Sequence, residues 1–359
     1  MRVAFVSART IHHAETDTTA RLDRLAAAVA NRGHEVTCYT SKWWQGDFRE
    51  FEHEGLAYRG IGNGPGEGMG IPLKVANAIR KADPDVVHVV CGDHRWTHGA
   101  KWGASLTGAG LLIDWYDPPA TTGLLSGWRR NRTLKRADYV VTPSQTVETA
   151  VRERGVNGRS VRVIPTGIDL ERIKSIPAVE SGDIVYSREL DEGANLETLL
   201  LALAEFREYD WNASIIGDGP RRAQYERQTR DLRIDDRVEF LGALPLEERI
   251  ARFKHAHVYV HTADYTPFAH DLLRALATGC VSIVEYHEHS SAHELVVHED
   301  RGYTATSPEQ LTRRLAAAGD LEGKSFDESF EQFSDEAFLE AYLDLYRSIK
   351  PTSNSATIG

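Results

Sequence analysis

The stretch at residues 257–296 constrains the fold of this chain more than any other part. Two short apolar runs, at residues 258–260 and 281–284, flank a segment in which leucines recur at helical spacing. Pro267 opens the helical segment and Gly279 follows it, as is typical of residues that begin and end helices. A strand, a helix and a second strand in this order predict one unit of an α/β sheet. The backbone N–H groups at the predicted helix start have no partners within the helix, so an anion can bind there.

The first half of the chain repeats this alternation. Residues 2–7 are predicted to form a buried strand, residues 18–30 an amphipathic helix, and the residues after Gly33 a second strand. Further buried strands are predicted at residues 85–90 and 111–119. The loop after the first strand lacks the G-x-G-x-x-G pattern, so a nicotinamide-type dinucleotide site is unsupported.

Length and composition exclude several classes of protein. At 359 residues the chain suits two domains of ordinary size, and its net charge of −11 argues against general nucleic-acid binding. No run approaches the roughly 20 apolar residues of a membrane span, and Met1 leads directly into the first predicted strand. We therefore expect a cytoplasmic protein without a signal peptide. The three cysteines lack metal-ligand spacing, so we expect buried free thiols and no metal site: Cys38, Cys91 and Cys280.

Several polar side chains fall near predicted strand ends in the first half. In an open parallel sheet those ends face the ligand-binding crevice, so the cluster is a candidate ligand site. Its members are His88, Asp93, His94, Asp114 and Asp117, with His12 and His13 in the loop after the first strand. Each residue taken singly is more often a capped or salt-bridged structural group, and both interpretations stay open.

Residues 124–136 combine apolar and basic side chains in one short predicted helix. Trp128 and three leucines occur there with five cations, Arg129, Arg130, Arg132, Lys135 and Arg136. Such a helix can dock on an anionic lipid surface, which would make the protein peripheral to the inner face of a membrane. A solvated basic face is the simpler alternative.

The sequence VRVIPTGID at residues 161–169 predicts the end of the first domain. Pro165 and Gly167 break an apolar strand there and give a defined bend rather than a loose tether. The chain is then divided into a first domain, a second domain, an amphipathic helix and a disordered polar tail: residues 1–168, 169–333, 334–350 and 351–359, respectively.

Taken in order, four stretches resemble family-4 glycosyltransferases of the GT-B type. They are Gly33-His-Glu-Val-Thr37, the junction Pro165-Thr-Gly-Ile-Asp169, the turn Gly217-Asp-Gly-Pro220, and the framework from Pro267 through Gly279 to Glu294. The resemblance implies an α/β fold of two Rossmann-like domains that face each other across a cleft, with the last helix crossing back to the first domain. It places a nucleotide-sugar donor on the second domain and an acceptor on the first, where the candidates are His12, His13, His88 and Asp93.

The function that the resemblance implies is transfer of a hexose from a nucleotide-sugar donor to a glycan or lipid-linked acceptor. The reaction is expected to retain the anomeric configuration and to serve surface polysaccharide synthesis or protein glycosylation. We expect no cofactor and no metal ion, because the nucleotide-sugar is a substrate.

The resemblance also identifies the residues expected to bind the donor. Arg188 matches an arginine that holds the donor diphosphate, whereas Ala194 stands where the family has a second cation, a lysine. Losing one charged hydrogen bond weakens binding by about 1.5–3 kcal/mol, so we expect reduced rather than abolished affinity. The candidate donor-binding residues are Arg188, Asn195, Gly217, Asp218, Gly219, Thr266, Pro267, Phe268, Arg274 and Glu294.

Two positions of this chain depart from the family pattern. Thr266 and Arg274 stand where the family has glutamates, one beside the sugar and one on the ribose hydroxyls. The glutamate at the sugar supports a transition state of oxocarbenium character, and a threonine cannot supply that charge. Asp264 and Asp271 are the hypothesised replacements, and Asp271 can pair with Arg274 three residues later. Together with Asp117, they are the candidate catalytic residues.

These departures also favour a second interpretation, a catalytically degenerate GT-B protein. Such a protein would bind a nucleotide-sugar as the partner or regulator of an active transferase. A third interpretation, a GT-B relative such as an epimerase or phosphorylase, lacks support because no Lys or His pattern for pyridoxal phosphate is evident. Incubation with a panel of nucleotide-sugars separates the first two interpretations.

Overall fold

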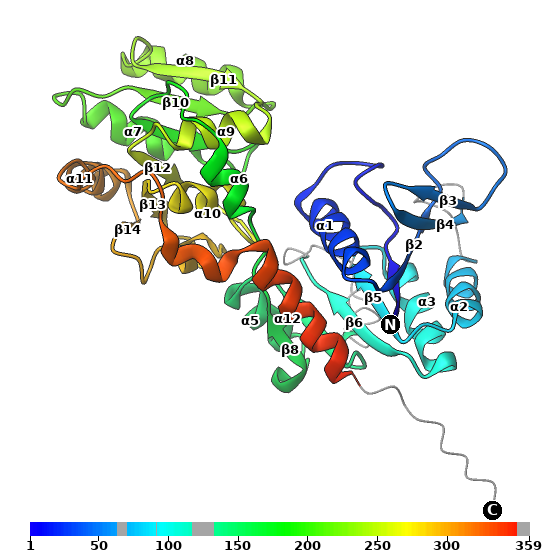
Figure 1. Ribbon diagram of the computed structural model, residues 1–359. Helices are drawn as coiled ribbons and strands as arrows, with labels where there is room; N and C mark the ends of the chain where they lie inside the picture. The colour runs from blue at the N-terminus through cyan, green and yellow to red at the C-terminus, as the bar shows by residue number, and fades with distance from the viewer. Residues whose placement is uncertain (63–69, 91, 117–132, 350–359) are drawn as a thin grey trace, which may run out of the picture. The chain divides into compact units, whose positions relative to one another are not determined.

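The computed structural model describes residues 1–62, 70–90, 92–116 and 133–349, and the chain divides into two compact units. The first unit contains residues up to Pro165 and the described residues from Phe338 onward, and the second contains residues 166–337. Each unit is a sheet with helices on its faces, which confirms the predicted α/β class (Figure 1). The division after Pro165 falls three residues before the boundary predicted at residue 168.

The first unit contains an eight-stranded sheet. Its strands are β1 Arg2–Val6, β2 Glu35–Ser41, β3 Glu50–His53, β4 Leu56–Gly62, β5 Val86–Val90, β6 Gly110–Asp114, β7 Tyr139–Thr142 and β8 Val161–Val163. Their order is β3-β4-β2-β1-β5-β6-β7-β8, and all neighbours run parallel except the β3–β4 hairpin. The central strands are buried along almost their whole length, as expected where helices cover both faces of a parallel sheet.

Three helices of the first unit, α1, α3 and α5, start at side-chain caps, and α2 and α3 pack closely. The described helices are α1 Asp17–Asn31, α2 Ile71–Ala82, α3 His94–Thr107, α5 Gln145–Glu153 and the 3-10 helix η1 Gly158–Ser160. Thr16 and Thr19 form a reciprocal capping box at the start of α1. α3 packs directly on α2, because a Cβ added at Gly99 would lie 2.7 Å from the Pro72 carbonyl oxygen and one at Gly103 2.5 Å from the Cβ of Ile79.

The second unit contains a six-stranded sheet in which all neighbours run parallel. Its strands are β9 Ile184–Ser187, β10 Ala213–Ile216, β11 Val238–Gly242, β12 Val258–His261, β13 Val281–Glu285 and β14 Gly302–Ala305, in the order β11-β10-β9-β12-β13-β14. Its helices are α6 Leu170–Ser175, α7 Leu196–Glu205, α8 Arg222–Leu232, α9 Leu246–Phe253, α10 His270–Ala277, α11 Pro308–Gly319, η2 Ala292–Leu295 and η3 Glu328–Phe333. Across the described ranges of both units, no helix combines the length and apolar character needed to cross a membrane.

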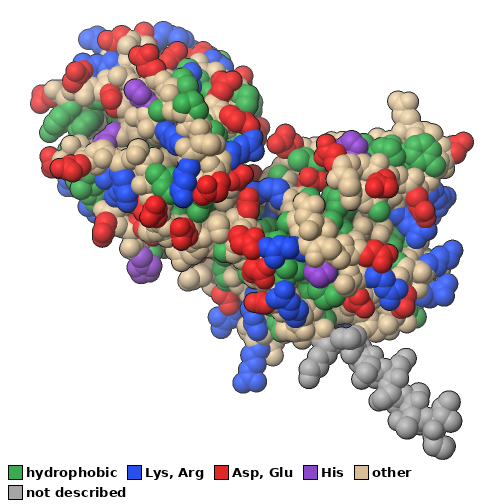
Figure 2. Space-filling model, in the orientation of Figure 1, with side chains coloured by type: hydrophobic (Ala, Val, Ile, Leu, Met, Phe, Trp, Pro, Cys, Tyr) green, Lys and Arg blue, Asp and Glu red, His purple; other side chains and the backbone are tan. Residues whose placement is uncertain are grey.

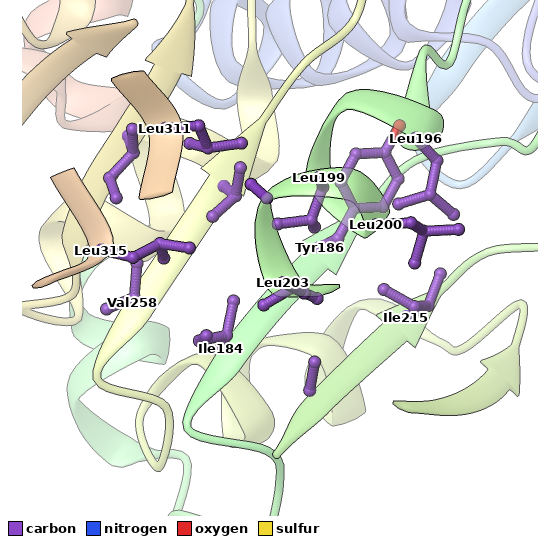
Figure 3. Close-up of a cluster of buried hydrophobic side chains, with 14 of the residues drawn as sticks. Ile184, Tyr186, Leu196, Leu199, Leu200, Leu203, Ile215, Val258, Leu311 and Leu315 are labelled. Atoms are coloured by element: carbon purple, nitrogen blue, oxygen red, sulfur yellow. The ribbon is translucent and has the colours of Figure 1, made fainter. Parts of the chain in front are cut away.

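Helix α7 supplies much of the core of the second unit. Its four buried leucines follow the spacing i, i+3, i+4 and i+7, which places them on one face of the helix: Leu196, Leu199, Leu200 and Leu203. Figure 3 shows these side chains among apolar residues from β9, β10, β12 and α11: Ile184, Tyr186, Ile215, Val258, Leu311 and Leu315. Burying one such leucine contributes about 1.5–3 kcal/mol. This core fixes the strands whose ends carry the candidate site.

The helix predicted to open at Pro267 begins three residues later, with α10 at His270. The difference has a physical cause in the loop after β13. The Ser291 hydroxyl donates to the carbonyl oxygens of Thr266 (3.0 Å) and Pro267 (2.8 Å), and its backbone N–H also donates to Thr266 (2.9 Å). These bonds hold residues 266–267 outside the helix.

Helix α12, Asp335–Ser348, follows the second unit in sequence but packs mainly within the first. Arg21 of α1 is fully buried there, and its guanidinium donates to Asp114 (3.2 Å), to the Ile164 carbonyl (2.9 Å) and to the Tyr342 hydroxyl of α12 (2.5 Å). The Tyr342 hydroxyl in turn donates to Asp114 (2.8 Å). Burying this ion pair is tolerated because each charge is hydrogen-bonded, and the network ties α12 to the sheet.

Candidate functional site

Loops at the carboxyl ends of the second unit's strands gather most of the predicted donor-binding residues. Arg188 follows β9, the turn 217–219 follows β10, residues 262–269 follow β12, and a polar loop follows β13. Ligands of open parallel sheets bind at this edge, outside the carboxyl ends of the strands. The topology therefore brings together residues that are about 100 positions apart in sequence.

The Arg188 guanidinium is held in place while keeping one donor without a partner. Its Nη1 donates to the Tyr265 carbonyl and to the Thr266 hydroxyl, both at 3.2 Å, and its Nη2 lies 3.7 Å from Asp191. The Nε is buried and has no hydrogen-bond partner among the described residues. With its side chain 24% exposed, the guanidinium is pre-oriented to donate to an oxyanion such as a phosphate.

The turn at residues 217–219 lies directly against the backbone around Arg188. A Cβ at Gly217, which has φ 134°, would lie 1.8 Å from the Arg188 carbonyl oxygen. A Cβ at Gly219, with φ 156°, would lie 2.6 Å from the Leu190 carbonyl oxygen. Only glycine fits both the conformation and the space, so the turn helps to fix the loop that carries the guanidinium. Asp218 between them accepts from the Gly219 N–H at 2.8 Å.

Thr266 is buried and lies between a cation and an uncharged imidazole. Its hydroxyl contacts the Nε2 of His261 at 3.0 Å as well as the Arg188 guanidinium. Burial, together with the nearby cation of Arg188, lowers the pKa of His261 to about 3, so this imidazole is uncharged at neutral pH. The position that carries a glutamate in the resembled family thus has no negative charge here.

Asp271 is the centre of a buried ion cluster. Its carboxylate accepts from the Ser187 hydroxyl (2.7 Å), from Arg274 (2.8 Å) and from Arg249 of α9. Burial opposes ionisation, but the two guanidinium groups and the hydrogen bonds outweigh it and hold the pKa of Asp271 below its ordinary value. The expected pair with Arg274 is therefore present, and both carboxylate oxygens are engaged. Arg249 gave no motif signal, since it lies 22 residues before Asp271 on another helix.

A second cluster of polar and charged side chains, which we call the Glu285 cluster, lies at the ends of β12 and β13. It consists of Glu285, His287, Asp264 and Asn195. Glu285 accepts from the Asn195 amide at 2.9 Å, and the Nε2 of His287 lies 3.8 Å from both Glu285 and Asp264. Burial raises the pKa of Glu285, while the imidazole of His287 opposes the shift. Glu285 and His287 were missed in the sequence, although a carboxylate directly after a buried apolar run is the signal that could have found them.

Three further residues predicted to bind the donor differ in how exposed they are and in what they contact. Phe268 is 4% exposed and packs in an apolar cluster with α10, so it does not lie at the surface of the site. Asn195 caps α7 in the left-handed conformation (φ 49°), and its amide also donates to the Thr262 carbonyl at 3.0 Å. Glu294 lies half-buried in η2, beside the Ser291 loop that holds Thr266 and Pro267.

The acceptor-side candidates of the first unit divide into two groups. His12 stacks on Trp43 with ring centroids 4.0 Å apart, and burial followed by the charge of His53 lowers its pKa. His13 accepts or donates through Nδ1 at the Thr10 hydroxyl (3.2 Å), and burial lowers its pKa too. Both histidines follow β1 at the carboxyl edge of the sheet. Asp117 lies outside the described residues, as do residues 124–132 of the predicted basic helix.

His88 and Asp93 have structural partners instead. His88 is 0% exposed, its Nδ1 lies 2.6 Å from the Tyr346 hydroxyl of α12, and its Nε2 lies 3.6 Å from Asp114. The placement of His88 at a ligand surface is therefore wrong, because α12 covers it. Asp93 caps α3 and pairs with Arg95 at 2.5 Å, which explains the lowered pKa of its carboxyl despite partial burial.

Models of two protein families match consecutive parts of the chain. "Glycosyltransferase Family 4" matches residues 19–172, and "Glycosyl transferases group 1" matches residues 168–336. Among curated proteins, the chain is 24% identical over 163 residues to alpha-monoglucosyldiacylglycerol synthase of Streptococcus pneumoniae, covering 41% of this chain and 37% of that protein. It is 26% identical over 153 residues to the gpi3 subunit of phosphatidylinositol N-acetylglucosaminyltransferase of Schizosaccharomyces pombe, covering 41% and 34%. The matched part is thus little more than a third of either relative.

Solved structures share the fold along almost the whole chain. The UDP complex of Anabaena Alr3699/HepE has a TM-score of 0.77 at 15% identity, covering 97% of this chain and 100% of that one. Sucrose-phosphate synthase from Thermosynechococcus elongatus has a TM-score of 0.74 at 19% identity, covering 97% and 98%. At these identities the likeness concerns the fold.

Proposed function

Because this chain belongs to the family-4 glycosyltransferases of the GT-B fold, we propose that it transfers a hexose from a nucleotide-sugar donor to a glycan or lipid-linked acceptor. One relative is named as the synthase of a monoglucosyldiacylglycerol and another as a phosphatidylinositol N-acetylglucosaminyltransferase subunit, and both names support a lipid acceptor. Solved structures of Anabaena Alr3699/HepE hold UDP and UDP-glucose, which supports a nucleoside diphosphate as the donor's leaving group. We infer retention of the anomeric configuration from the family resemblance.

The observation that carries this proposal is the partly unsatisfied guanidinium of Arg188. The guanidinium is 24% exposed, and its Nη2 lies 3.7 Å from Asp191, beyond hydrogen-bond range, so Nη2 keeps donors for the oxygens of a diphosphate. When the bond between the sugar and the diphosphate breaks, negative charge grows on the departing oxygen. Arg188, already fixed by Tyr265 and Thr266, stabilises that charge without having to move.

The sugar side of the reaction needs negative charge, and we assign it to the Glu285 cluster. Thr266 and the neutral His261 supply none, and the carboxylate of Asp271 is engaged by two arginines. Asp264, with a side chain 56% exposed, and Glu285 remain at the same strand ends. Their carboxylates would support the positive charge that develops on the departing hexose.

A direct test measures release of nucleoside diphosphate by the purified chain. UDP-, GDP- and dTDP-sugars are supplied with and without a mixture of glycan and lipid-linked acceptors. The proposal expects acceptor-dependent release with at least one donor, and loss of one charged hydrogen bond in Arg188→Gln should weaken donor binding by about 1.5–3 kcal/mol. Arg230→Gln, an exposed change on α8, is the matched control.

Both carboxylate oxygens of Asp271 are engaged by other side chains, and Thr266 carries no charge. The absence of a free carboxylate at these two positions favours a second candidate function, a protein that binds the donor without turning it over. Calorimetry separates the two functions. Binding of a nucleotide-sugar that depends on Arg188, without release in the presence of acceptors, would establish the second candidate in place of the first. For the active enzyme we place the reaction at the cytoplasmic face of a membrane, where lipid-linked acceptors are available.

A further inference from the structure

We propose that an aromatic surface between β2 and β3 stacks on a pyranose ring of the acceptor, which is therefore a free or lipid-linked saccharide and not a sugar-free lipid. We call it the ring surface, and its members contact one another through their rings: Trp43, Trp44, Phe48 and Phe51, with His12 and His53 beside them. All six residues belong to the first unit. The inference rests on the proposed transfer reaction, because it names the chemical class of the acceptor.

The ring surface lies at the edge of the sheet where ligands bind. Trp43 and Trp44 come two and three residues after the end of β2, and His12 lies in the loop after the neighbouring parallel strand β1. The ring of Trp43 stacks on His12 with centroids 4.0 Å apart, which joins these two loops. Ligands of open parallel sheets bind beyond the carboxyl ends of the strands, so the rings lie in the region expected for the acceptor.

The rings are held in position by contacts within the loop and with β3. Trp44 stacks on Phe51 with centroids 5.4 Å apart and an interplanar angle of 23°, and it lies at 16° to the ring of Phe48. The indole N–H of Trp44 donates to the Phe48 carbonyl at 3.1 Å. A surface that is ordered in this way loses little conformational entropy when a ligand binds.

Part of this aromatic surface is left uncovered by the protein. Phe48 is 50% exposed, and the rings of Trp43, Trp44 and Phe51 are only partly buried. Figure 2 shows hydrophobic side chains at the surface at the upper right of the first unit, where Figure 1 places the loop between β2 and β3. A ligand that covers these rings removes apolar area from water, which favours binding.

The composition of this segment selects a saccharide among the ligands that cover aromatic rings. Residues 42–55 contain four Trp and Phe residues but no Leu, Ile, Val or Met, so the segment offers no aliphatic side chains to an acyl chain. Four carboxylates outnumber two cations in the same residues, which disfavours an anionic bilayer and a nucleic-acid backbone. A neutral pyranose ring has C–H groups on one face, and these pack on the electron-rich face of an aromatic ring.

Two imidazoles beside the rings can bind the hydroxyl groups of the sugar. The rings of His12 and His53 meet edge to face with centroids 4.9 Å apart, and the side chain of His53 is 37% exposed. Burial followed by the charge of His53 lowers the pKa of His12, so this imidazole is uncharged at neutral pH and has one donor and one acceptor nitrogen. A hydroxyl group likewise donates and accepts, so the two are complementary.

The test is saturation-transfer difference NMR of the full chain with the methyl glycosides of glucose, galactose, mannose and N-acetylglucosamine. Irradiation of the protein's aromatic protons should transfer magnetisation to the C–H protons of at least one glycoside. Phe48→Ala should weaken the affinity about fivefold, whereas Phe48→Tyr, which keeps the ring, should stay within about twofold of the unmodified chain. The matched control is Tyr209→Ala, which removes a 56% exposed ring from the second unit and should leave the affinity unchanged.

Several results would overturn the inference. One is the absence of transfer to all four glycosides, and another is an equal loss in Phe48→Ala and Tyr209→Ala. Release of nucleoside diphosphate that is fastest with sugar-free diacylglycerol would show that the acceptor needs no sugar. A dimer in sedimentation equilibrium that Phe48→Ala dissociates, without glycoside binding, would assign the rings to a second copy of the chain.

Failure of the proposed transfer reaction gives a different result. Glycoside binding that depends on Phe48, with no release of nucleoside diphosphate from any donor, would refute the reaction while establishing the ring surface as a saccharide site. The NMR readout makes this distinction because it requires no turnover.

Discussion

Removing the carboxylate of Asp271 should destabilise the second unit and do so only above acidic pH. The side chain is 11% exposed and accepts from Arg249, Arg274 and Ser187. Breaking a buried ion pair by removing one partner costs about 3–5 kcal/mol, because the remaining charge is left uncompensated. Arg249 is 28% exposed and can reach water, so we expect about 3 kcal/mol for Asp271→Ala. Over the second unit this corresponds to a melting temperature lowered by roughly 6–12 °C.

The destabilisation caused by Asp271→Ala should depend on pH. In the folded chain the pKa of Asp271 lies below its ordinary value of 3.8, so the ion cluster stabilises the fold above that pH. The contribution is lost as the pH falls through the folded-state pKa, where the carboxyl becomes protonated. The difference in unfolding free energy between the unmodified chain and Asp271→Ala should therefore be constant near neutral pH and shrink toward zero in acid.

Urea unfolding followed by circular dichroism, from about pH 7 down to about pH 2, measures both the destabilisation and its loss in acid. Asp264→Asn is the matched control, because that carboxylate is 56% exposed and its loss should change stability by less than about 0.5 kcal/mol. Equal midpoints for the two variants at neutral pH would refute the reasoning, as would a difference that persists undiminished in acid. Turnover provides a separate readout, since unchanged rates in both variants would exclude a role for either carboxylate in transfer.

Three further outcomes follow from the described contacts. Glu285→Gln should lower turnover about tenfold or more with little change in the KM for donor, whereas exposed Glu288→Gln should behave as unmodified in the same assay. Gly217→Ala should abolish calorimetric donor binding, because its Cβ would meet the Arg188 carbonyl at 1.8 Å; retained affinity would contradict that packing. Tyr346→Phe should cost about 1–3 kcal/mol in urea unfolding by leaving the buried histidine of β5 without its partner, and an unchanged midpoint would show that the bond contributes nothing.

The spacing of apolar residues and the positions of proline and glycine predicted many of the strands and helices, because these elements depend mostly on residues that are close in sequence. The apolar runs at residues 258–260 and 281–284 became β12 and β13, and the helix between them ends at Ala277, two residues before the left-handed Gly279. The start of that helix was wrong by three residues, because Ser291 from a later loop holds the carbonyls of Thr266 and Pro267. A bond between segments 25 residues apart leaves no periodic signal.

The candidate site was predictable only where residue type and local position agree. Arg188 and the turn at 217–219, both singled out by the resemblance, lie at the ends of the adjacent strands β9 and β10. His88 was misplaced because its partner, Tyr346, lies 258 residues away on the last helix. Arg249 was missed for the same reason, since α9 carries no motif and only packing brings it to Asp271. Long-range pairs of buried charges are the part of such a site that a single sequence does not reveal.

The packing of α12 has a consequence for how the chain is made. A Cβ at Gly110 in β6 would lie 1.6 Å from the Ile349 side chain, so the residue that follows α12 packs directly on a central strand of the first unit. The ribosome synthesises that segment only after all of the second unit. The first unit therefore starts to form early but waits for α12, because the Arg21–Asp114 pair lacks its hydrogen bonds to Tyr342 until then. A chain cut at residue 337 would keep every strand that the structure describes and would still lack the helix that completes the first unit.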